Sequence, residues 1–230
     1  MNGTCPKPIA DWLRLMVARK ASDLFLTAGF PPAIKLDGKV TPLSKQSLTP
    51  NETLSMAHSV MTERVRAEFD AHNEANFAIH DLEIGRFRVS AFVQQGRVGV
   101  VFRLVNTRIP RLEELHLPPI LQDIAMMPRG LVLVVGATGS GKSTTLAAMI
   151  GHRNQIAQEH IITVEDPIEY VHQHGSSIIT QREVGTDTES WEVALKNTLR
   201  QAPDVIMLGE IRDVEAMEYA LAYAETGHLC

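Results

Sequence analysis

A glycine-rich loop that directly follows an apolar run constrains the fold of this chain more than any other feature. Residues 131–135, LVLVV, lead into GATGSGKST at residues 136–144, which fits the pattern G-x-x-x-x-G-K-[S/T]. Backbone without Cβ atoms can turn successive N–H groups inward around a polyphosphate, and a helix that begins at Lys142 adds the positive end of its dipole. The order strand, loop, helix therefore predicts an α/β sheet with a phosphate-binding loop at the end of one strand.

The composition of the loop predicts a nucleoside triphosphate with Mg²⁺ as the ligand. We expect the Lys142 amine to reach the β- and γ-phosphates, the Ser143 hydroxyl to bind Mg²⁺ and Thr144 to border the α-phosphate. The dinucleotide-binding pattern G-x-G-x-x-G does not fit this stretch and would leave Lys142 without a role. The candidate phosphate-binding residues are Gly136, Ala137, Thr138, Gly139, Ser140, Gly141, Lys142, Ser143 and Thr144.

Two glutamates directly follow apolar runs in the same part of the chain. Glu165 ends HIITVE and Glu210 ends DVIMLGE. Ligands of open α/β sheets bind at the carboxyl ends of the strands, and hydrolysis needs carboxylates that activate water and hold Mg²⁺. We therefore expect Glu165 and Glu210 to be catalytic. Asp166, before Pro167, is explained equally well as a turn residue. Asp213 is expected to be a helix N-cap and is not a catalytic candidate.

Two patterns of elements divide the chain. Residues 1–106 combine short helices with strands in which apolar and polar residues alternate, which is typical of a small α+β domain. Residues 107–119 are rich in proline and charge and are predicted to be a linker. In residues 120–230 short apolar runs alternate with helical patterns, which predicts a parallel sheet with helices on both faces.

Local signals in the first part predict individual elements. Asp37 and Gly38 should form the tight turn of a hairpin. Thr49 and Glu52 should form a capping box at the start of a helix. The apolar face of that helix is expected to carry Leu54, Ala57, Met61 and Val65. Three antiparallel strands should follow, one with a basic face carrying Arg86, Arg88 and Ser90.

Composition limits the classes of function. The net charge of −5 argues against non-specific nucleic-acid binding as the main task, because phosphate neutralisation needs a basic surface. No apolar run approaches the roughly 18 residues that span a bilayer. The two cysteines lie at opposite ends of the sequence, and the first residues lack a signal-peptide core. We expect a cytoplasmic protein whose membrane association is peripheral.

Taken together, the motifs resemble those of the motor ATPases of type IV pilus retraction, the twitching-motility PilT/PilU family within the secretion ATPase superfamily. The matching stretches are SDLFLTAGFPPAIKLDGKV, GATGSGKSTTLAAMI, HIITVEDPIEYVHQH, DVIMLGEIRD and AETGHL. HQHGSSIITQREVG and AETGHLC resemble the PilU branch. The resemblance implies a PAS-like N-terminal domain, a RecA-like P-loop NTPase core and a homo-hexameric ring.

The resemblance also implies roles for individual residues. Residues 136–144 match the Walker A loop, and Glu165 matches the candidate general base. Glu210 matches the Walker B glutamate, which lies near Mg²⁺ and the attacking water. His228 falls in the family's histidine box, which is thought to sense the γ-phosphate. Arg88 and Arg103 match positions that supply arginine fingers, although arginines on a strand face are more often simply solvated.

The function implied is ATP hydrolysis, with ATP and Mg²⁺ as cofactors, that drives pilus retraction through domain movement. The implied partners are a platform protein of the inner membrane and a partner retraction ATPase. Two alternatives stay open: a pilus assembly or type II secretion ATPase, and a nucleotide-gated accessory module with low turnover. Family members continue beyond the position that matches Cys230, so we expect the chain to be C-terminally truncated.

Overall fold

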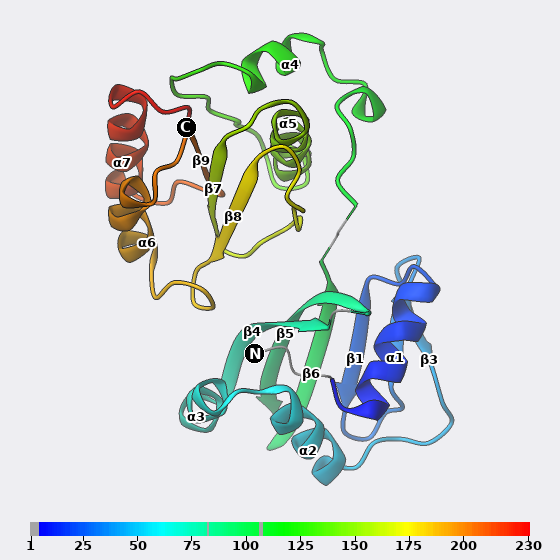
Figure 1. The fold of residues 1–230 in the computed structure, drawn as a ribbon. Helices are drawn as coiled ribbons and strands as arrows, with labels where there is room; N and C mark the ends of the chain where they lie inside the picture. The colour runs from blue at the N-terminus through cyan, green and yellow to red at the C-terminus, as the bar shows by residue number, and fades with distance from the viewer. Residues whose placement is uncertain (1–4, 82, 106–107) are drawn as a thin grey trace. The chain divides into compact units, whose positions relative to one another are not determined.

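The computed structural model describes residues 5–81, 83–105 and 108–230. The chain divides into two compact units between residues 105 and 106 (Figure 1). Residues 106 and 107, where the sequence predicts the end of the first domain and the start of the linker, lie outside the described residues.

The first unit is an antiparallel sheet with strand order β3-β2-β1-β6-β5-β4. The strands are β1 (Asp23–Thr27), β2 (Ala33–Leu36), β3 (Lys39–Pro42), β4 (Glu74–Asp81), β5 (Gly85–Gln94) and β6 (Arg97–Leu104). The helices described here are α1 (Lys7–Ala18), α2 (Pro50–Val60) and α3 (Glu63–His72). Side chains of these helices and of one sheet face form a single apolar core that includes Leu13, Ala57, Phe69, Phe87 and Phe102.

The local predictions for this unit are confirmed at the hairpin and in the alternating strand. Asp37 and Gly38 have φ angles of 48° and 77° and connect β2 to β3. Along β5, Phe87, Val89 and Ala91 are at most 2% exposed, whereas their neighbours face the other side of the sheet. The period of two therefore identified the core face correctly.

The predicted helix face from Leu54 to Val65 is wrong. Helix α2 ends at Val60, Met61 is extended, and Thr62 caps the separate helix α3 by accepting a hydrogen bond from Val65 N at 3.3 Å. Leu54 is 39% exposed, whereas Ala57 is buried. The helical spacing of apolar residues continues from α2 into α3, so it does not mark the boundary between the two helices. The boundary is marked by Thr62, whose hydroxyl caps α3.

Thr49 and Glu52 form the predicted capping box, which gives a testable prediction. Thr49 Oγ1 accepts from Glu52 N at 3.2 Å, and Glu52 Oε2 accepts from Thr49 N at 2.7 Å. We expect Thr49→Ala to lower the unfolding free energy of this unit by about 1 kcal/mol. Urea unfolding followed by Trp12 fluorescence in a Trp191→Phe background measures it.

The matched control is Ser55→Ala, an exposed position on the same helix. This variant should not lower the urea midpoint, because Ser55 lies in the helix interior and alanine has a higher helix propensity there. Equal midpoints for the Thr49 and Ser55 variants would show that the capping box contributes nothing.

The second unit is built on a parallel sheet with strand order β8-β7-β9. The strands are β7 (His160–Glu165), β8 (Ile178–Glu183) and β9 (Val205–Leu208). The helices described here are α4 (Ile120–Ala125), α5 (Lys142–Ile156), α6 (Trp191–Thr198) and α7 (Val214–Glu225), and a 3₁₀ helix, η2 (Leu199–Gln201), follows α6.

Two apolar clusters cover the two faces of this sheet. Ile150 of α5 packs with Ile161 on one face, whereas Val164 packs on the other face with residues of α6 and α7. Figure 1 shows α5 on one side of the sheet and α6 and α7 on the other. The predicted arrangement of helices on both faces is therefore present.

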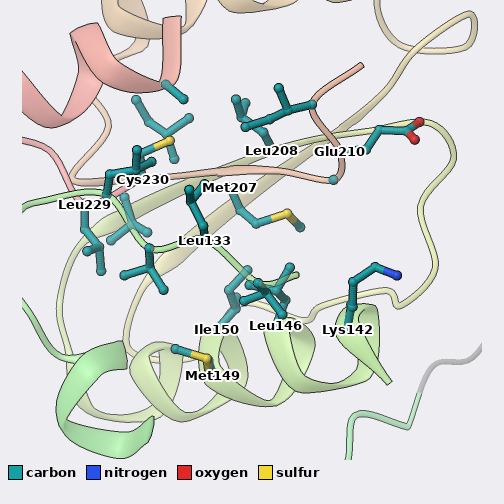
Figure 2. Close-up of a pocket in the computed structure, with 18 of the residues that line it drawn as sticks. Leu133, Lys142, Leu146, Met149, Ile150, Met207, Leu208, Glu210, Leu229 and Cys230 are labelled. Carbon is teal, nitrogen blue, oxygen red and sulfur yellow. The ribbon is translucent and has the colours of Figure 1, made fainter. Parts of the chain in front are cut away.

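The predicted strand at residues 131–135 is not formed. Val132 N donates to Cys230 O at 2.8 Å, but Leu133 and Val135 are 53% and 88% exposed. Leu229 forms parallel bridges with both Gly130 and Val205, so it lies between this segment and β9. After Val132, a largely apolar cavity of about 500 Å³ separates the segment 133–135 from β9 (Figure 2). Residues 133–135 therefore have no backbone hydrogen-bond partner among the described residues.

Part of the predicted linker packs onto the second unit. It contains a 3₁₀ helix, η1 (Glu113–Leu115), and Leu112 is buried with Ala125 and Met149. A Cβ at Gly151 of α5 would lie 3.3 Å from Ile109 Cγ2. The proline and charged residues suggested a linker, although several apolar residues of this segment pack onto the second unit. Among all described residues, no helix has the length and apolarity needed to cross a bilayer.

Candidate active site

The glycine-rich loop leads directly into α5, and glycine is required at two of its positions. Gly139 and Gly141 have φ angles of 79° and 92°, in the left-handed region that disfavours side chains. Gly141 is the N-cap of α5, and no side chain caps this helix start. The first N–H groups of a helix of 15 residues are therefore available to an anion.

Lys142 folds back over the loop. Its Nζ donates to Gly136 O and Ala137 O, both at 2.9 Å. These neutral carbonyls are weaker acceptors than phosphate oxygens, so a polyphosphate can displace them. Figure 2 shows Lys142 and Glu210 at one end of the apolar cavity, away from Leu229 and Cys230.

Glu165, at the end of β7, is a buried carboxyl group. It is 6% exposed, and its Oε1 accepts from Thr163 Oγ1 at 2.7 Å and from Gln181 Nε2 at 3.1 Å. Burial raises the pKa of Glu165, and the hydrogen bonds from Thr163 and Gln181 oppose that shift. A carboxyl group with a raised pKa is suited to accepting a proton near neutral pH.

The end of β9 approaches Glu165 closely. A Cβ at Gly209 would lie 3.2 Å from Glu165 Cα, so glycine allows the two strand ends to meet. A second cavity of about 250 Å³ is lined by Lys142, Ser143, Glu165 and Glu210, among others. The structure therefore brings both predicted glutamates and the predicted phosphate-binding helix start to one cavity.

Arg212 belongs to this site although no sequence motif predicted it. Its guanidinium lies 3.1 Å from Asp166 Oδ2 and 2.5 Å from Glu210 Oε1, so it joins the carboxyl ends of β7 and β9. Asp166 thus has an ion pair as well as its turn position. The sequence feature that could have indicated this contact is the position of Arg212, two residues after Glu210.

Tyr170 was also not predicted from the sequence, and it connects the segment after β7 to α5. The Tyr170 hydroxyl lies 3.0 Å from Thr144 Oγ1, in the first turn of α5. The Tyr170 carbonyl accepts from Gln181 Nε2 at 2.9 Å. Nothing in the local sequence indicates these contacts, because they join segments that are far apart in the chain.

Arg88 and Arg103 lie in the first unit, side by side in the register of β5 and β6. Arg103 Nε donates to Asp23 Oδ1 of β1 at 2.8 Å, and Asp23 is 2% exposed. Arg103 therefore has a buried acidic partner within its own sheet. This ion pair holds the guanidinium on the sheet face opposite the helices.

His228 follows α7 and bonds back to its end. Its Nδ1 lies 3.1 Å from Thr226 Oγ1 and 3.2 Å from Tyr223 O. Among the described residues, His228 does not belong to the set that lines the 250 Å³ cavity. The structure thus does not bring it together with Lys142, Glu165 and Glu210.

Two curated proteins of Pseudomonas aeruginosa are similar to this chain over nearly its whole length. The type IV pilus ATPase PilU of Pseudomonas aeruginosa is 60% identical over 218 residues, which cover 95% of this chain and 57% of that protein. The type IV pilus retraction ATPase PilT of the same organism is 42% identical over 221 residues, covering 96% of this chain and 64% of that protein.

A solved structure shows the same fold. The crystal structure of the pilus retraction motor PilT with bound ADP superposes with a TM-score of 0.90 at 45% identity, over 95% of this chain and 64% of that one. The chain thus spans 57% to 64% of the length of these relatives. A family model described as type II/IV secretion system protein matches residues 7–230. The chain therefore belongs to the family of type II/IV secretion system proteins and has the α/β fold of its ATPases.

Proposed function

We propose that this protein hydrolyses ATP to drive type IV pilus retraction in twitching motility. The observation that carries the proposal is the 250 Å³ cavity, which joins the helix start at Lys142 and Ser143 to the carboxyl groups of Glu165 and Glu210. Phosphoryl transfer to water needs these components: donors for the phosphates, oxygen ligands for Mg²⁺ and a base.

Each side chain has a task in this mechanism. Lys142 exchanges two loop carbonyls for the β- and γ-phosphates, while the loop N–H groups hold the chain of phosphates in place. Ser143 and Glu210 supply oxygen atoms of the kind Mg²⁺ binds, and the metal would neutralise charge on the β- and γ-phosphates. Glu165 accepts the proton of the attacking water, because its burial favours the protonated form.

The remaining assignments extend the proposal to the whole protein. We assign residues 1–106 to a PAS-like domain, residues 107–119 to a linker and residues 120–230 to a RecA-like core. In a homo-hexameric ring, Arg88 or Arg103 would reach the nucleotide of a neighbouring subunit, and His228 would sense the γ-phosphate. The solved PilT motor with ADP supports the nucleotide, and the pilus ATPases among the relatives support the pathway.

The proposed motor also needs a place in the cell. We propose that it works on the cytoplasmic side of the inner membrane, where it contacts a platform protein and a partner retraction ATPase. In this arrangement neither a membrane span nor nucleic acid takes part.

Lys142→Ala tests this function. We expect the affinity for Mg·ATP to fall roughly 10- to 100-fold, the equivalent of one lost charged hydrogen bond. Isothermal titration with Mg·ATP measures affinity, and phosphate release by the wild type measures turnover. Arg200→Ala, an exposed residue of η2, is the matched control and should bind as wild type does. A wild-type protein that releases no phosphate from ATP, alone or with a partner motor, would exclude the proposal.

A further inference from the structure

Thr163 and Gln181 place two hydrogen-bond donors on one oxygen of Glu165. Thr163 and Gln181 are direct partners in the register of β7 and β8, and Thr163 is fully buried. Because Thr163 and Glu165 are two residues apart on a strand, their side chains share a face. One polar side chain of β7 and one of the neighbouring β8 thus converge on the proposed general base.

The orientation of Gln181 is fixed from three sides. Its Oε1 accepts from His172 N at 2.7 Å, and its Nε2 donates to Tyr170 O at 2.9 Å and to Glu165 Oε1 at 3.1 Å. A flipped amide would place its oxygen against the Tyr170 carbonyl and the Glu165 carboxylate. Gln181 therefore always presents N–H to Glu165.

The charged groups around Glu165 influence whether its carboxyl group is ionised, as the two donors do. Its acidic neighbours are Glu183 on β8, Glu210 after β9, and Asp166 and Glu169 after β7. Its basic neighbours are Lys142 on α5 and Arg212, which is paired with Asp166 and Glu210. Burial lowers the pKa of His172 to about 4, so this imidazole is neutral at pH 7. Burial, and to a lesser extent the charge of Glu169, favour protonated Glu165, whereas the donors from Thr163, Gln181 and the Glu169 backbone N–H favour its ionised form.

We propose that Thr163 and Gln181 are positioning residues that orient the Glu165 carboxylate toward the cavity by holding its Oε1. Because both side-chain donors come from strands of the sheet, the Oε1 atom is held by rigid elements. Gln181 also fixes the segment that carries Tyr170, and thereby links the base to the first turn of α5. This inference rests on the proposed ATPase function.

The pH dependence of turnover tests this role through Thr163→Val and Gln181→Leu. Both variants remove a donor to the ionised carboxylate and keep a similar side-chain volume. The pKa of Glu165 should therefore rise, and a base is active only when deprotonated. We expect the acid limb of the kcat/KM profile to move about one unit to higher pH, with most of the loss recovered at alkaline pH.

Two further variants control for packing. Thr163→Ser keeps the hydroxyl and should keep the wild-type profile. Thr198→Val removes another fully buried threonine hydroxyl, which donates to Ala194 O within α6, and should leave the acid limb in place. Thermal unfolding of each variant reports how much stability was lost.

The outcomes separate this inference from the function on which it rests. An acid limb that stays in place in Thr163→Val and Gln181→Leu, with turnover reduced equally at every pH, overturns the positioning role and leaves the ATPase intact. A Thr163→Ser variant as impaired as Thr163→Val overturns it as well. A wild-type protein without ATP turnover removes both the function and the positioning role.

Discussion

Replacing Glu165 with glutamine is expected to lower ATP turnover about 10²- to 10⁴-fold while nucleotide binding persists. The amide has the shape of the carboxyl group and can still accept a hydrogen bond from Thr163, but it cannot take a proton from water. Steady-state phosphate release gives the loss of turnover, and titration with ADP gives the affinity.

The comparison variant is Glu192→Gln, an exposed carboxylate in the first turn of α6. It has the same chemistry as the Glu165 substitution, but it lies outside the cavity. Its turnover should equal that of the wild type. If Glu165→Gln turned over ATP as fast as Glu192→Gln, another group would have to act as the base.

The sequence predicts those parts of the site that depend on short, contiguous stretches of residues. The proposed phosphate-binding loop is nine contiguous residues, Glu165 is the last residue of β7, and Glu210 lies two residues after the end of β9. Because parallel strands align their carboxyl ends, two such residues reach the same sheet edge without any knowledge of strand order. The capping residue Asp213 is equally local, and its Oδ1 accepts from Ala216 N at 2.8 Å.

The contacts that the sequence did not predict depend on register and strand order. Gln181 meets Thr163 only because β8 pairs with β7 in one particular register, and a shift of one residue would turn its side chain to the other face. The ion pairs of Arg212 need β9 beside β7. Residues 131–135 have the composition of a strand, but a strand also needs neighbours to accept its hydrogen bonds.

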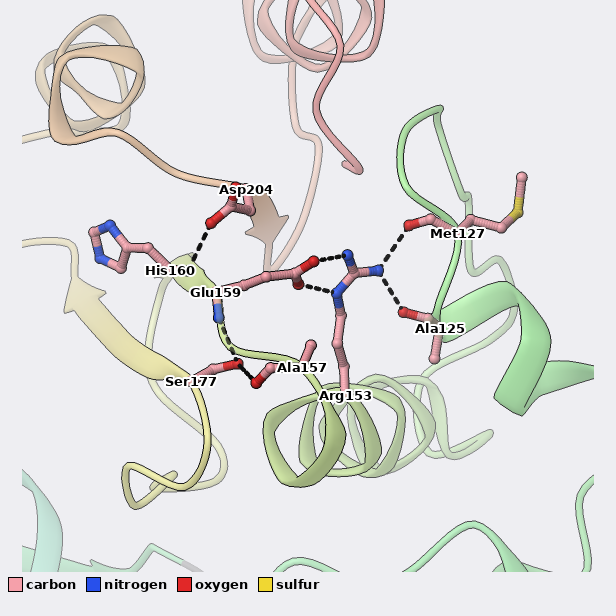
Figure 3. A network of polar contacts seen from close by, with 8 residues as sticks. All are labelled: Ala125, Met127, Arg153, Ala157, Glu159, His160, Ser177 and Asp204. Carbon is pink, nitrogen blue, oxygen red and sulfur yellow. Dashed lines mark hydrogen bonds and ion pairs between the residues drawn. The ribbon is translucent and has the colours of Figure 1, made fainter.

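Arg153 on α5 lies at the centre of a buried polar network (Figure 3). Its Nε and Nη2 donate to the two oxygens of Glu159 at 2.6 and 2.8 Å. Its Nη1 donates to Ala125 O at 2.8 Å and Met127 O at 2.7 Å, and the residue is 4% exposed. One guanidinium therefore ties the end of α4 and the start of β7 to α5.

Substituting this residue gives the largest expected loss of stability. We expect Arg153→Met to lower the unfolding free energy of the second unit by about 3–5 kcal/mol, because Glu159 and two carbonyl groups lose their partner. Methionine fills a similar volume, so the loss reports the polar contacts rather than a cavity. Urea unfolding followed by Trp191 fluorescence in a Trp12→Phe background measures it.

The pair variant Arg153→Met with Glu159→Met distinguishes the cost of an unpaired charge from the value of the pair. A buried ion pair replaced by two apolar side chains often costs little, whereas removal of one partner leaves the other unpaired. The double variant should therefore be more stable than Arg153→Met alone, while the exposed Arg200→Met should match the wild type. If Arg153→Met unfolded at the wild-type urea concentration, α4 and β7 would be held to α5 by apolar packing alone.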